Sequence, residues 1–273
     1  MSEEDFESNA PTITIGVAMH KEYNIPNDDI YVPIHVGADC HPDTLTHAIQ
    51  DNTGINISSL NPYFSELTAL YWLWKNCDSD YKGLVHYRRY LAPSTIHERH
   101  SPPRKQRAIT RRSLARQLQS HNIILPSKRH YIIETIRSRY AHTLPSEQLN
   151  TARSVLSALS SQSIPAWDNV MRRRSAHMFN MTVMDKADFN SYCTWLFPIL
   201  FECMKRLSPK QYDAFNARYP GRISELLMDT WILTNHKHYV ELPTVSPEPI
   251  NWWKKGFGFL MAKFAGRKYH ASF

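Results

Sequence analysis

Short apolar, β-branched runs alternate with a segment of helical periodicity in the first third of the chain. Residues 12–19 (TITIGVAM) and 30–36 (IYVPIHV) predict two strands of a mostly buried sheet. Residues 66–76 then repeat apolar side chains at helical spacing, and residues 82–86 (KGLVH) return to a strand-like run. Strand, helix and strand in close succession favour a βαβ-type unit, and therefore an α/β fold.

The rest of the chain adds one clear strand and several helices. Residues 179–184 (FNMTVM) predict a buried strand, and residues 187–207 predict a long amphipathic helix with a kink near Pro198. Helices are also predicted over 131–140, 144–163 and 223–234, and a short extended piece over 123–125. Because no internal repeat or linker divides the chain, we expect one domain over residues 12–250, after a disordered, acidic N-terminus at residues 1–11.

Composition indicates a folded protein that meets an anionic partner. Of the 273 residues, 42% are apolar and 21% are charged, which excludes a disordered, charge-driven chain. The formal net charge of +7 points to nucleic acid, phosphate groups or an anionic membrane surface. The four cysteines lack CxxC spacing, and the chain has no signal-peptide pattern and no run of about 18–20 apolar residues. We therefore expect a cytoplasmic protein.

Two segments carry much of the positive charge. Residues 98–116 hold seven Arg and Lys residues against one acid, and we expect an exposed basic loop that leads into a helix. Residues 251–273 hold five Lys and Arg residues and no acid, interleaved with aromatic side chains. This composition is typical of a tail that lies on an anionic membrane surface, although a tail packed on the domain or partly disordered is an equal alternative. Binding of this tail to single-stranded nucleic acid is a weaker alternative.

Common catalytic signatures are absent, and one cluster stands out instead. The chain has no P-loop, GxGxxG, HExxH, GxSxG or CxxC pair. Residues 51–91 form the densest polar cluster, which ends where a predicted strand delivers His86, Tyr87, Arg88 and Arg89. Sheets of α/β proteins bind ligands at the carboxyl ends of their strands, and paired arginines suit a pyrophosphate. Only one of the two arginines would face the ligand unless the strand has ended, and an arginine pair bridging carboxylates is the structural alternative.

Several motifs, in order, connect the chain to a known family. They are NISSLNPYFSELTALYWLWKN, GLVHYRRYL, IILPSKRHY, FNMTVMDKADFNSYCTWLFPILFE and GRISELLMDTWI. With them the chain closely resembles, over roughly residues 12–235, the capsular and exopolysaccharide biosynthesis family that was first known only as a domain of unknown function. That family is linked to glycosyl transfer, including galactofuranosyl transfer. The 98–116 segment and the C-terminal tail are the parts least similar to it.

The resemblance implies a glycosyltransferase with a GT-A-like, Rossmann-type nucleotide-sugar-binding domain and added helices. GT-A enzymes usually end a central strand in Asp-x-Asp, which binds a divalent metal, whereas this strand ends in residues 86–89 without a carboxylate. Fixed positive charge can stabilise a departing nucleoside diphosphate, so we expect no metal cofactor. The expected partners are a UDP-sugar donor and a lipid-linked oligosaccharide or polysaccharide acceptor, with galactofuranose or galactose as the transferred hexose.

Inverting transfer also needs a general base, most simply a carboxylate. The candidates are Glu66, Asp168, Glu225 and Asp229. We favour Glu225 because it follows the predicted 179–184 strand and the long helix, where GT-A enzymes place acceptor-side acids. Glu225 and Asp229 share one helix face by their spacing, which also allows a purely structural pairing with Arg218 or Arg222. We assign His86 and Arg88 to catalysis together with this base.

The remaining candidates are assigned to the donor and the acceptor. The donor-binding candidates are His20, Lys21, Asp39, Asn56, Ser58, Glu66, Tyr87, Arg89 and Asn180. Loops after the early strands bind the base and ribose in Rossmann-like domains, although solvated turns would have the same composition. On the acceptor side we expect Trp167, in the 165–168 loop, to stack on a sugar beside Asp168 and Asp229.

Two other functions stay open at this level. One is a nucleic-acid-binding protein that uses the 98–116 segment and the tail, and the other is an inactive scaffold of the same fold. A nucleic-acid binder would not need the polar cluster at residues 51–91, which favours the glycosyltransferase.

Overall fold

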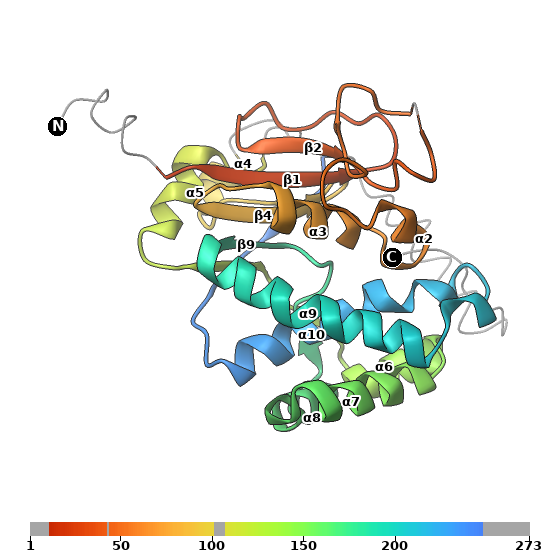
Figure 1. The fold of residues 1–273 in the computed structure, drawn as a ribbon. Coiled ribbons are helices and arrows are strands. Elements are labelled where there is room, and N and C mark those ends of the chain that lie inside the picture. The colour runs from red at the N-terminus through yellow and green to blue at the C-terminus, as the bar shows by residue number, and fades with distance from the viewer. Residues whose placement is uncertain (1–10, 43, 101–106, 248–273) are drawn as a thin grey trace, which may run out of the picture.

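The computed structural model describes residues 11–42, 44–100 and 107–247. The predicted acidic N-terminus and basic aromatic tail therefore lie outside the described residues. A seven-stranded sheet in the order β10-β6-β9-β4-β1-β2-β3 forms the centre (Figure 1). Its strands are β1 (Ile13–Met19), β2 (Tyr31–His35), β3 (Ile49–Gln50), β4 (Tyr81–His86), β6 (Ile123–Pro126), β9 (Thr182–Asp185) and β10 (Val240–Leu242). The fold is α/β, as predicted.

All but one of the neighbouring strands in this sheet run in the same direction. Strand β1 pairs in parallel with β2 and β4, β2 with β3, and β6 with β10. Strand β9 is antiparallel to both β4 and β6. The carboxyl ends of the parallel strands therefore meet at one edge, and the reversed direction of β9 brings the loop before it to that same edge.

Helices cover the sheet and extend the molecule on one side. They are α2 (Asn61–Phe64), α3 (Leu67–Asn76), α4 (Ile96–His100), α5 (Arg111–Leu118), α6 (Ile136–Thr143), α7 (Glu147–Leu159), α8 (Ile164–Arg172), α9 (Lys186–Arg206) and α10 (Tyr219–Thr234). Two short antiparallel pairs complete the fold, β5 (Tyr90–Leu91) with β11 (Thr244–Val245) and β7 (Arg129–His130) with β8 (Ser175–Ala176). Helices α9 and α10 lie against each other, and α6 to α8 form an outer layer beyond them (Figure 1).

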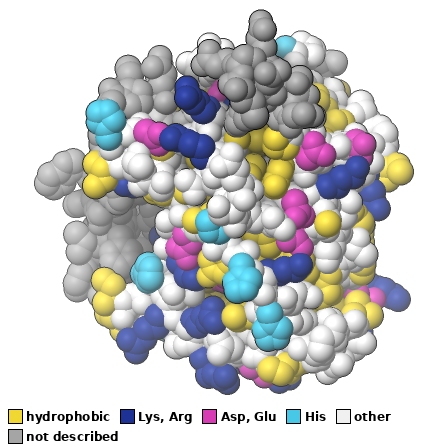
Figure 2. Space-filling view, turned by 90° about the vertical axis from the view of Figure 1, so that its left-hand side faces the viewer, with side chains coloured by type: hydrophobic (Ala, Val, Ile, Leu, Met, Phe, Trp, Pro, Cys, Tyr) yellow, Lys and Arg dark blue, Asp and Glu magenta, His cyan; other side chains and the backbone are white. Residues whose placement is uncertain are grey.

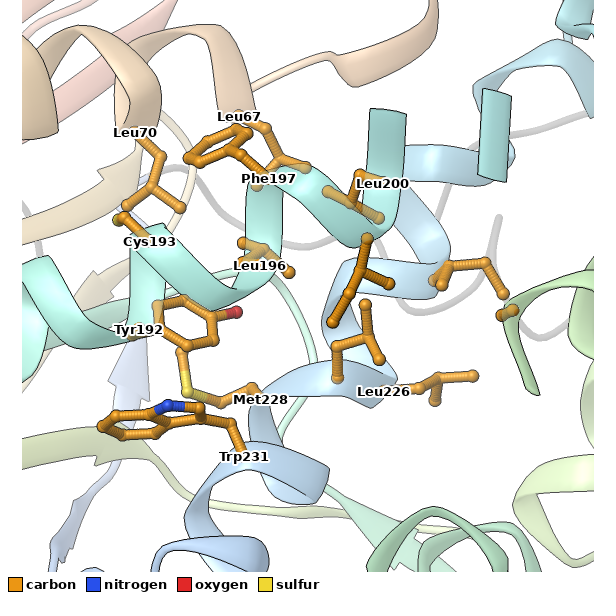
Figure 3. Close-up of a cluster of buried hydrophobic side chains, with 14 of the residues drawn as sticks. Leu67, Leu70, Tyr192, Cys193, Leu196, Phe197, Leu200, Leu226, Met228 and Trp231 are labelled. Atoms are coloured by element: carbon orange, nitrogen blue, oxygen red, sulfur yellow. The ribbon is translucent and has the colours of Figure 1, made fainter. Parts of the chain in front are cut away.

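The larger part of the core lies between α3, α9 and α10. Leu67 and Leu70 of α3 meet Phe197 of α9, and Trp231 of α10 packs edge-on against Tyr192 (Figure 3). These side chains are almost fully buried. Burying apolar surface contributes about 25 cal/mol per Å², so this layer holds α10 firmly against α9. The position of α10 matters because it carries part of the site described below.

Two predicted elements begin later than expected. The helix predicted over residues 131–140 starts only at Ile136, where the Thr135 side chain caps it by accepting a hydrogen bond from the Ser138 amide at 3.1 Å. The strand predicted over 179–184 starts at Thr182, because Phe179 and Asn180 have φ values of 86° and 52°. Left-handed backbone at two consecutive residues cannot continue a strand.

The basic segment at residues 98–116 is not a simple loop. Where it is described, it includes the end of α4 and most of α5. Arg111 forms a bidentate ion pair with Asp29, at 2.8 and 2.9 Å, and Arg116 pairs with Glu98 at 2.6 Å. Two of its arginines are thus neutralised by the chain itself, which weakens the nucleic-acid alternative.

Candidate functional site

A cleft of about 1390 Å³ opens at the carboxyl edge of the sheet. Its lining comes from the ends of β1, β2 and β4, from α2, from the loop before β9, and from α6 and α10. The opposite face of the molecule, at the amino ends of the parallel strands, carries basic and acidic side chains side by side (Figure 2). The cleft differs from that face because arginines dominate its charged lining.

The turn after β4 places both neighbouring arginines in the cleft. His86 and Arg89 exchange backbone hydrogen bonds of 3.2 and 2.9 Å, which close a tight turn immediately after the strand. Because the strand has ended, the alternation of side chains no longer applies, and Arg88 and Arg89 both line the cleft. The Arg89 guanidinium lies 3.6 Å from the ring centre of Phe179, and burial lowers its pKa.

An aromatic group accompanies Arg88 at the ends of β1 and β4. Tyr23 and Tyr87 stack with their ring centres 3.9 Å apart, and His20 meets Tyr87 edge-on at 5.1 Å. The Arg88 guanidinium lies 5.1 Å from the Tyr87 ring, and its Nη2 donates to the Tyr23 hydroxyl at 3.4 Å. Burial, followed by the charges of Lys21 and Arg88, lowers the pKa of His20, which favours the neutral imidazole.

The loop before β9 is tied to its surroundings at three points. The Phe179 amide donates to Glu225 Oε1 at 2.9 Å, and the Phe179 carbonyl accepts a hydrogen bond from His86 Nε2. The Asn180 side-chain amide donates to Glu66 Oε1 at 2.6 Å and to the Gly221 carbonyl at 2.9 Å. These bonds hold the two left-handed residues in place. Such strained backbone persists where its surroundings over-determine it, frequently at functional sites.

Glu225 of α10 has the environment of a base that works near neutral pH. Burial, and then the charge of Glu66, raise its pKa to about 7, against the opposing effects of the Phe179 amide, Arg222 and Arg89. Glu66 itself lies 3.9 Å from His86 Nε2. A carboxylate with a pKa close to the ambient pH can accept a proton and release it again, which general-base catalysis requires.

Positive charge surrounds these two carboxylates. Among the described lining residues the only acids are Glu66 and Glu225, and the arginines are Arg88, Arg89, Arg129, Arg139, Arg218 and Arg222. Glu66 is engaged by Asn180, and Glu225 by the Phe179 amide. Within the described part of the chain, no three His, Cys, Asp or Glu side chains gather as metal ligands. This arginine-rich set of side chains does not suit the divalent cation that GT-A folds usually hold, because a cation would be repelled.

The structure places the three residues predicted to bind the acceptor outside the cleft, buried or paired with other side chains. Trp167 lies inside α8 rather than in a loop and is 1% exposed. Asp168 is held by Arg153 in a bidentate ion pair of 2.8 and 2.7 Å that lowers its pKa, outside the cleft lining. Asp229 is buried against His177, at 2.5 Å from its ring nitrogen and 3.0 Å from its amide. None of the three can meet an acceptor there.

One predicted donor residue, Ser58, has a structural role instead. Ser58 is buried, and its hydroxyl donates to Asp51, whose carboxylate accepts the amides of Gly37 and Ala38 at 2.8 and 3.0 Å. Gly37 has a φ of 73°, and a Cβ there would lie 2.6 Å from an Asn61 oxygen, so this turn after β2 requires glycine.

Other predicted donor residues do not line the cleft. Asn56 bonds to the carbonyls of its own loop, at 2.9 and 3.1 Å, and Asp39 accepts from Asn52 at 3.1 Å. Lys21 lies over the Tyr23 ring at 5.3 Å. Asn180 orients Glu66 rather than lining the cleft itself.

The other predicted residues do line the cleft together: His20, Glu66, His86, Tyr87, Arg88, Arg89 and Glu225. Sequence reasoning missed the arginines that join them from β7 and α6, and it considered Arg218 and Arg222 only as structural partners of Glu225 and Asp229. The FN sequence before β9 held the signal for the Phe179 turn, because Asn tolerates left-handed backbone better than most residues. The arginines carried no such signal, since their approach depends on the packing of α6 and α10.

Comparisons with known proteins agree with this fold. No curated protein matches the chain. A solved structure described as the WbbM bifunctional glycosyltransferase in its apo form is similar, with a TM-score of 0.78 and 27% sequence identity. The similarity covers 86% of this chain but only 45% of that one, so this chain spans less than half the length of its structural relative. Residues 14–237 match the family described as a domain of unknown function, DUF4422, and the chain belongs to that family.

Proposed function

We propose that the chain is an inverting glycosyltransferase that moves a hexosyl group, galactofuranosyl or galactosyl, from a UDP-sugar to a capsular, exopolysaccharide or O-antigen acceptor. The observation that carries the proposal is a single carboxylate with a raised pKa, Glu225, which lies in an arginine-lined cleft at the carboxyl edge of the sheet. The similarity to a chain described as a glycosyltransferase supports it.

The donor would enter beside the ends of β1 and β4. Arg88 and Arg89 would face the diphosphate, whose oxygens suit the planar guanidinium fork. The aromatic group of His20, Tyr23 and Tyr87 offers apolar surface for the base next to these charges. Preorganised cations at the leaving oxygens stabilise the transition state most strongly, because negative charge develops on those oxygens there.

The chemical step would then use Glu225 as the base. The acceptor oxygen forms a bond to the anomeric carbon while the bond from that carbon to the diphosphate oxygen breaks. The bonding electrons leave with the nucleoside diphosphate, and the acceptor proton passes to Glu225. Glu66, oriented by Asn180, raises the basicity of Glu225 through its negative charge. Because the lining does not suit a divalent cation, we derive no step through a metal and propose metal-independent transfer.

Turnover of a UDP-hexose panel, with and without lipid-linked acceptors, tests the proposal. We expect release of UDP, and Arg88→Ala or Arg89→Ala should reduce kcat/KM by about 10²–10³. Arg153→Ala removes an equal charge from the exposed pair with Asp168 and should leave turnover unchanged. Full activity of Arg88→Ala would contradict the assignment, and a strict requirement for Mn²⁺ or Mg²⁺ would contradict its metal-independent part.

Membrane contact and cellular location are separate proposals. Within the described residues, no helix has both the length and the apolar character needed to cross a bilayer. The basic aromatic composition of residues 251–273 supports contact with an anionic membrane surface, at the cytoplasmic side where lipid-linked acceptors would be elongated. Vesicle binding by the full chain, compared with a variant in which the five cations of this tail are replaced by Gln, measures that contribution.

A further inference from the structure

We infer that the loop at residues 132–135, between β7 and α6, contacts the surface of an anionic lipid bilayer. Ile132 and Ile133 would enter the bilayer, and neighbouring arginines would meet the lipid phosphates. This isoleucine loop is separate from the tail at residues 251–273. The inference goes beyond the proposed function, because contact with lipid requires no glycosyl transfer.

Two adjacent isoleucines are the most exposed large apolar side chains among the described residues. Ile132 is 90% exposed and Ile133 is 81% exposed, whereas Ile96, Ile55 and Leu159 are 70%, 60% and 53% exposed. Single exposed apolar side chains are common on protein surfaces, so the latter three need no partner. Two neighbours that are both almost fully exposed form a small apolar tip, and removing that tip from water is favourable.

The base of the isoleucine loop is fixed by backbone hydrogen bonds. The Tyr131 amide donates to the Arg174 carbonyl at 2.7 Å, and the Ile136 amide donates to the Arg173 carbonyl at 2.8 Å. The Thr135 side chain caps α6 directly after the tip. Because both ends of the loop are held, the tip can meet a partner without a large further loss of chain entropy.

Two exposed arginines lie beside this tip. Arg174 Nη1 donates to the Ile132 carbonyl at 3.5 Å, and Arg137 lies in the first turn of α6, where its Nη2 donates to the Asn150 side chain at 3.3 Å. Among the described residues, both arginines bond only to uncharged oxygens. A guanidinium has five N–H donors, so each arginine can also donate to a phosphate oxygen.

The acids close to these arginines are held by other cations. Glu134, the acid of the loop, pairs with Arg139 at 3.4 Å and with His142. Asp168, which is reached by the charge of Arg137, is held in the bidentate ion pair described above. The isoleucine loop therefore presents an apolar tip with cations beside it.

A bilayer that contains anionic lipid matches both parts of this surface. A tip of two side chains buries far less than the roughly 1,000 Å² that a specific protein interface needs. At a bilayer, apolar side chains enter the boundary between headgroups and acyl chains, and arginines bind the phosphates at the same depth. Contact of this kind needs no preformed groove.

The isoleucine loop also adjoins the cleft. Tyr131, which directly precedes the tip, lines the cleft, and so do Ile136 and Arg139 of α6. A membrane on the loop would therefore lie beside this wall of the cleft. This orientation, unlike the contact itself, rests on the proposed function, because it would bring a lipid-linked acceptor to the cleft.

Sedimentation of the full chain with lipid vesicles tests the inference, with vesicles of phosphatidylcholine alone or mixed with phosphatidylglycerol. We expect the double variant Ile132→Ser/Ile133→Ser to bind the mixed vesicles about tenfold more weakly than the wild type, because it buries less apolar surface. Arg174→Gln should weaken binding to the mixed vesicles about fivefold and leave binding to phosphatidylcholine unchanged, because the lost charge acts on anionic lipid.

Ile55→Ser and Arg112→Gln are the matched controls and should bind vesicles as the wild type does. Ile55 is exposed in another loop, and Arg112 is exposed on α5, at the opposite side of the molecule from α6 (Figure 1). Unchanged binding of the double variant overturns the inference, as does an equal loss in Ile55→Ser or a wild type that binds no vesicles. Because every variant keeps the tail, the differences report on the isoleucine loop alone.

An environment-sensitive fluorophore at position 133 measures insertion directly. Ile133→Cys is labelled in a chain in which Cys40 and Cys77 are replaced by serine, since the other two cysteines are buried. We expect its emission to move to shorter wavelength with the mixed vesicles, and the same label at Ile55→Cys should show no change. A label at position 133 that shows no change overturns the inference. Neither measurement involves UDP or turnover, so a failure of the proposed function leaves both of them decisive.

Discussion

Replacing Glu225 with glutamine should weaken catalysis and strengthen the fold at the same time. Its pKa is about 7 in the folded chain, against 4.5 for an unperturbed glutamate, because burial and Glu66 disfavour the charged form. An acid with a raised pKa binds its proton more tightly when folded. Its contribution to stability is therefore present below the unfolded value and is lost as the pH rises through the folded value.

The size of this effect follows from the two pKa values. Their difference corresponds to about 3 kcal/mol of unfolding free energy, most of which develops between about pH 5 and about pH 8. Glutamine keeps the oxygen that accepts the Phe179 amide but carries no charge. Glu225→Gln should thus match the wild type closely near pH 5 and exceed its unfolding free energy by roughly 2–3 kcal/mol near pH 8.

Urea denaturation at both pH values measures this difference in unfolding free energy. On the same samples, kcat/KM should fall by about 10²–10⁴, as for removal of a general base. Wild-type activity should rise with pH through about 7. Glu202→Gln serves as the control, because Arg206 lowers the pKa of Glu202, so that this carboxylate stays ionised above about pH 5 and its stability difference should be nearly the same at both pH values. A stability difference for Glu225→Gln that is the same at both pH values would refute the reasoning.

Three further substitutions test the roles that the fold assigns. Trp167→Phe should lower the melting temperature without changing the KM for acceptor, since the ring is buried within α8; a raised KM with unchanged stability would restore the acceptor role. Asn180→Ala removes the bonds to Glu66 and to the Gly221 carbonyl, and should cost about 1–3 kcal/mol in unfolding free energy. It should also lower kcat more than it raises KM. Asn180→Asp, whose carboxylate can donate neither bond, should not restore activity. His177→Ala leaves the buried Asp229 without its imidazole partner and should cost about 3–5 kcal/mol by urea denaturation, and a loss below about 1 kcal/mol would show that the pair is unimportant.

The sequence by itself determined most of the elements and the part of the cleft lining at the end of β4. Apolar, β-branched runs and helical periodicity identified β1, β2, β4, α3 and α9 closely, because burial of those side chains decides the local structure. The HYRR sequence after β4 indicated ligand-binding side chains since the carboxyl end of a parallel strand is where such side chains gather. Glu225 was predicted as the general base from its place in the motif around it.

Tertiary structure alone decided the acceptor side. Whether Trp167 is a loop platform or a core residue depends on α8 packing against α10, and whether Asp229 is accessible depends on His177, far away in the sequence. Arg222 of α10 and Arg89 after β4 are far apart in the sequence and both act on Glu225, which no local pattern encodes. Burial and the charge of Glu66 raise the pKa of Glu225, so this pKa and the arginine-rich lining of the cleft exist only once the distant segments have come together.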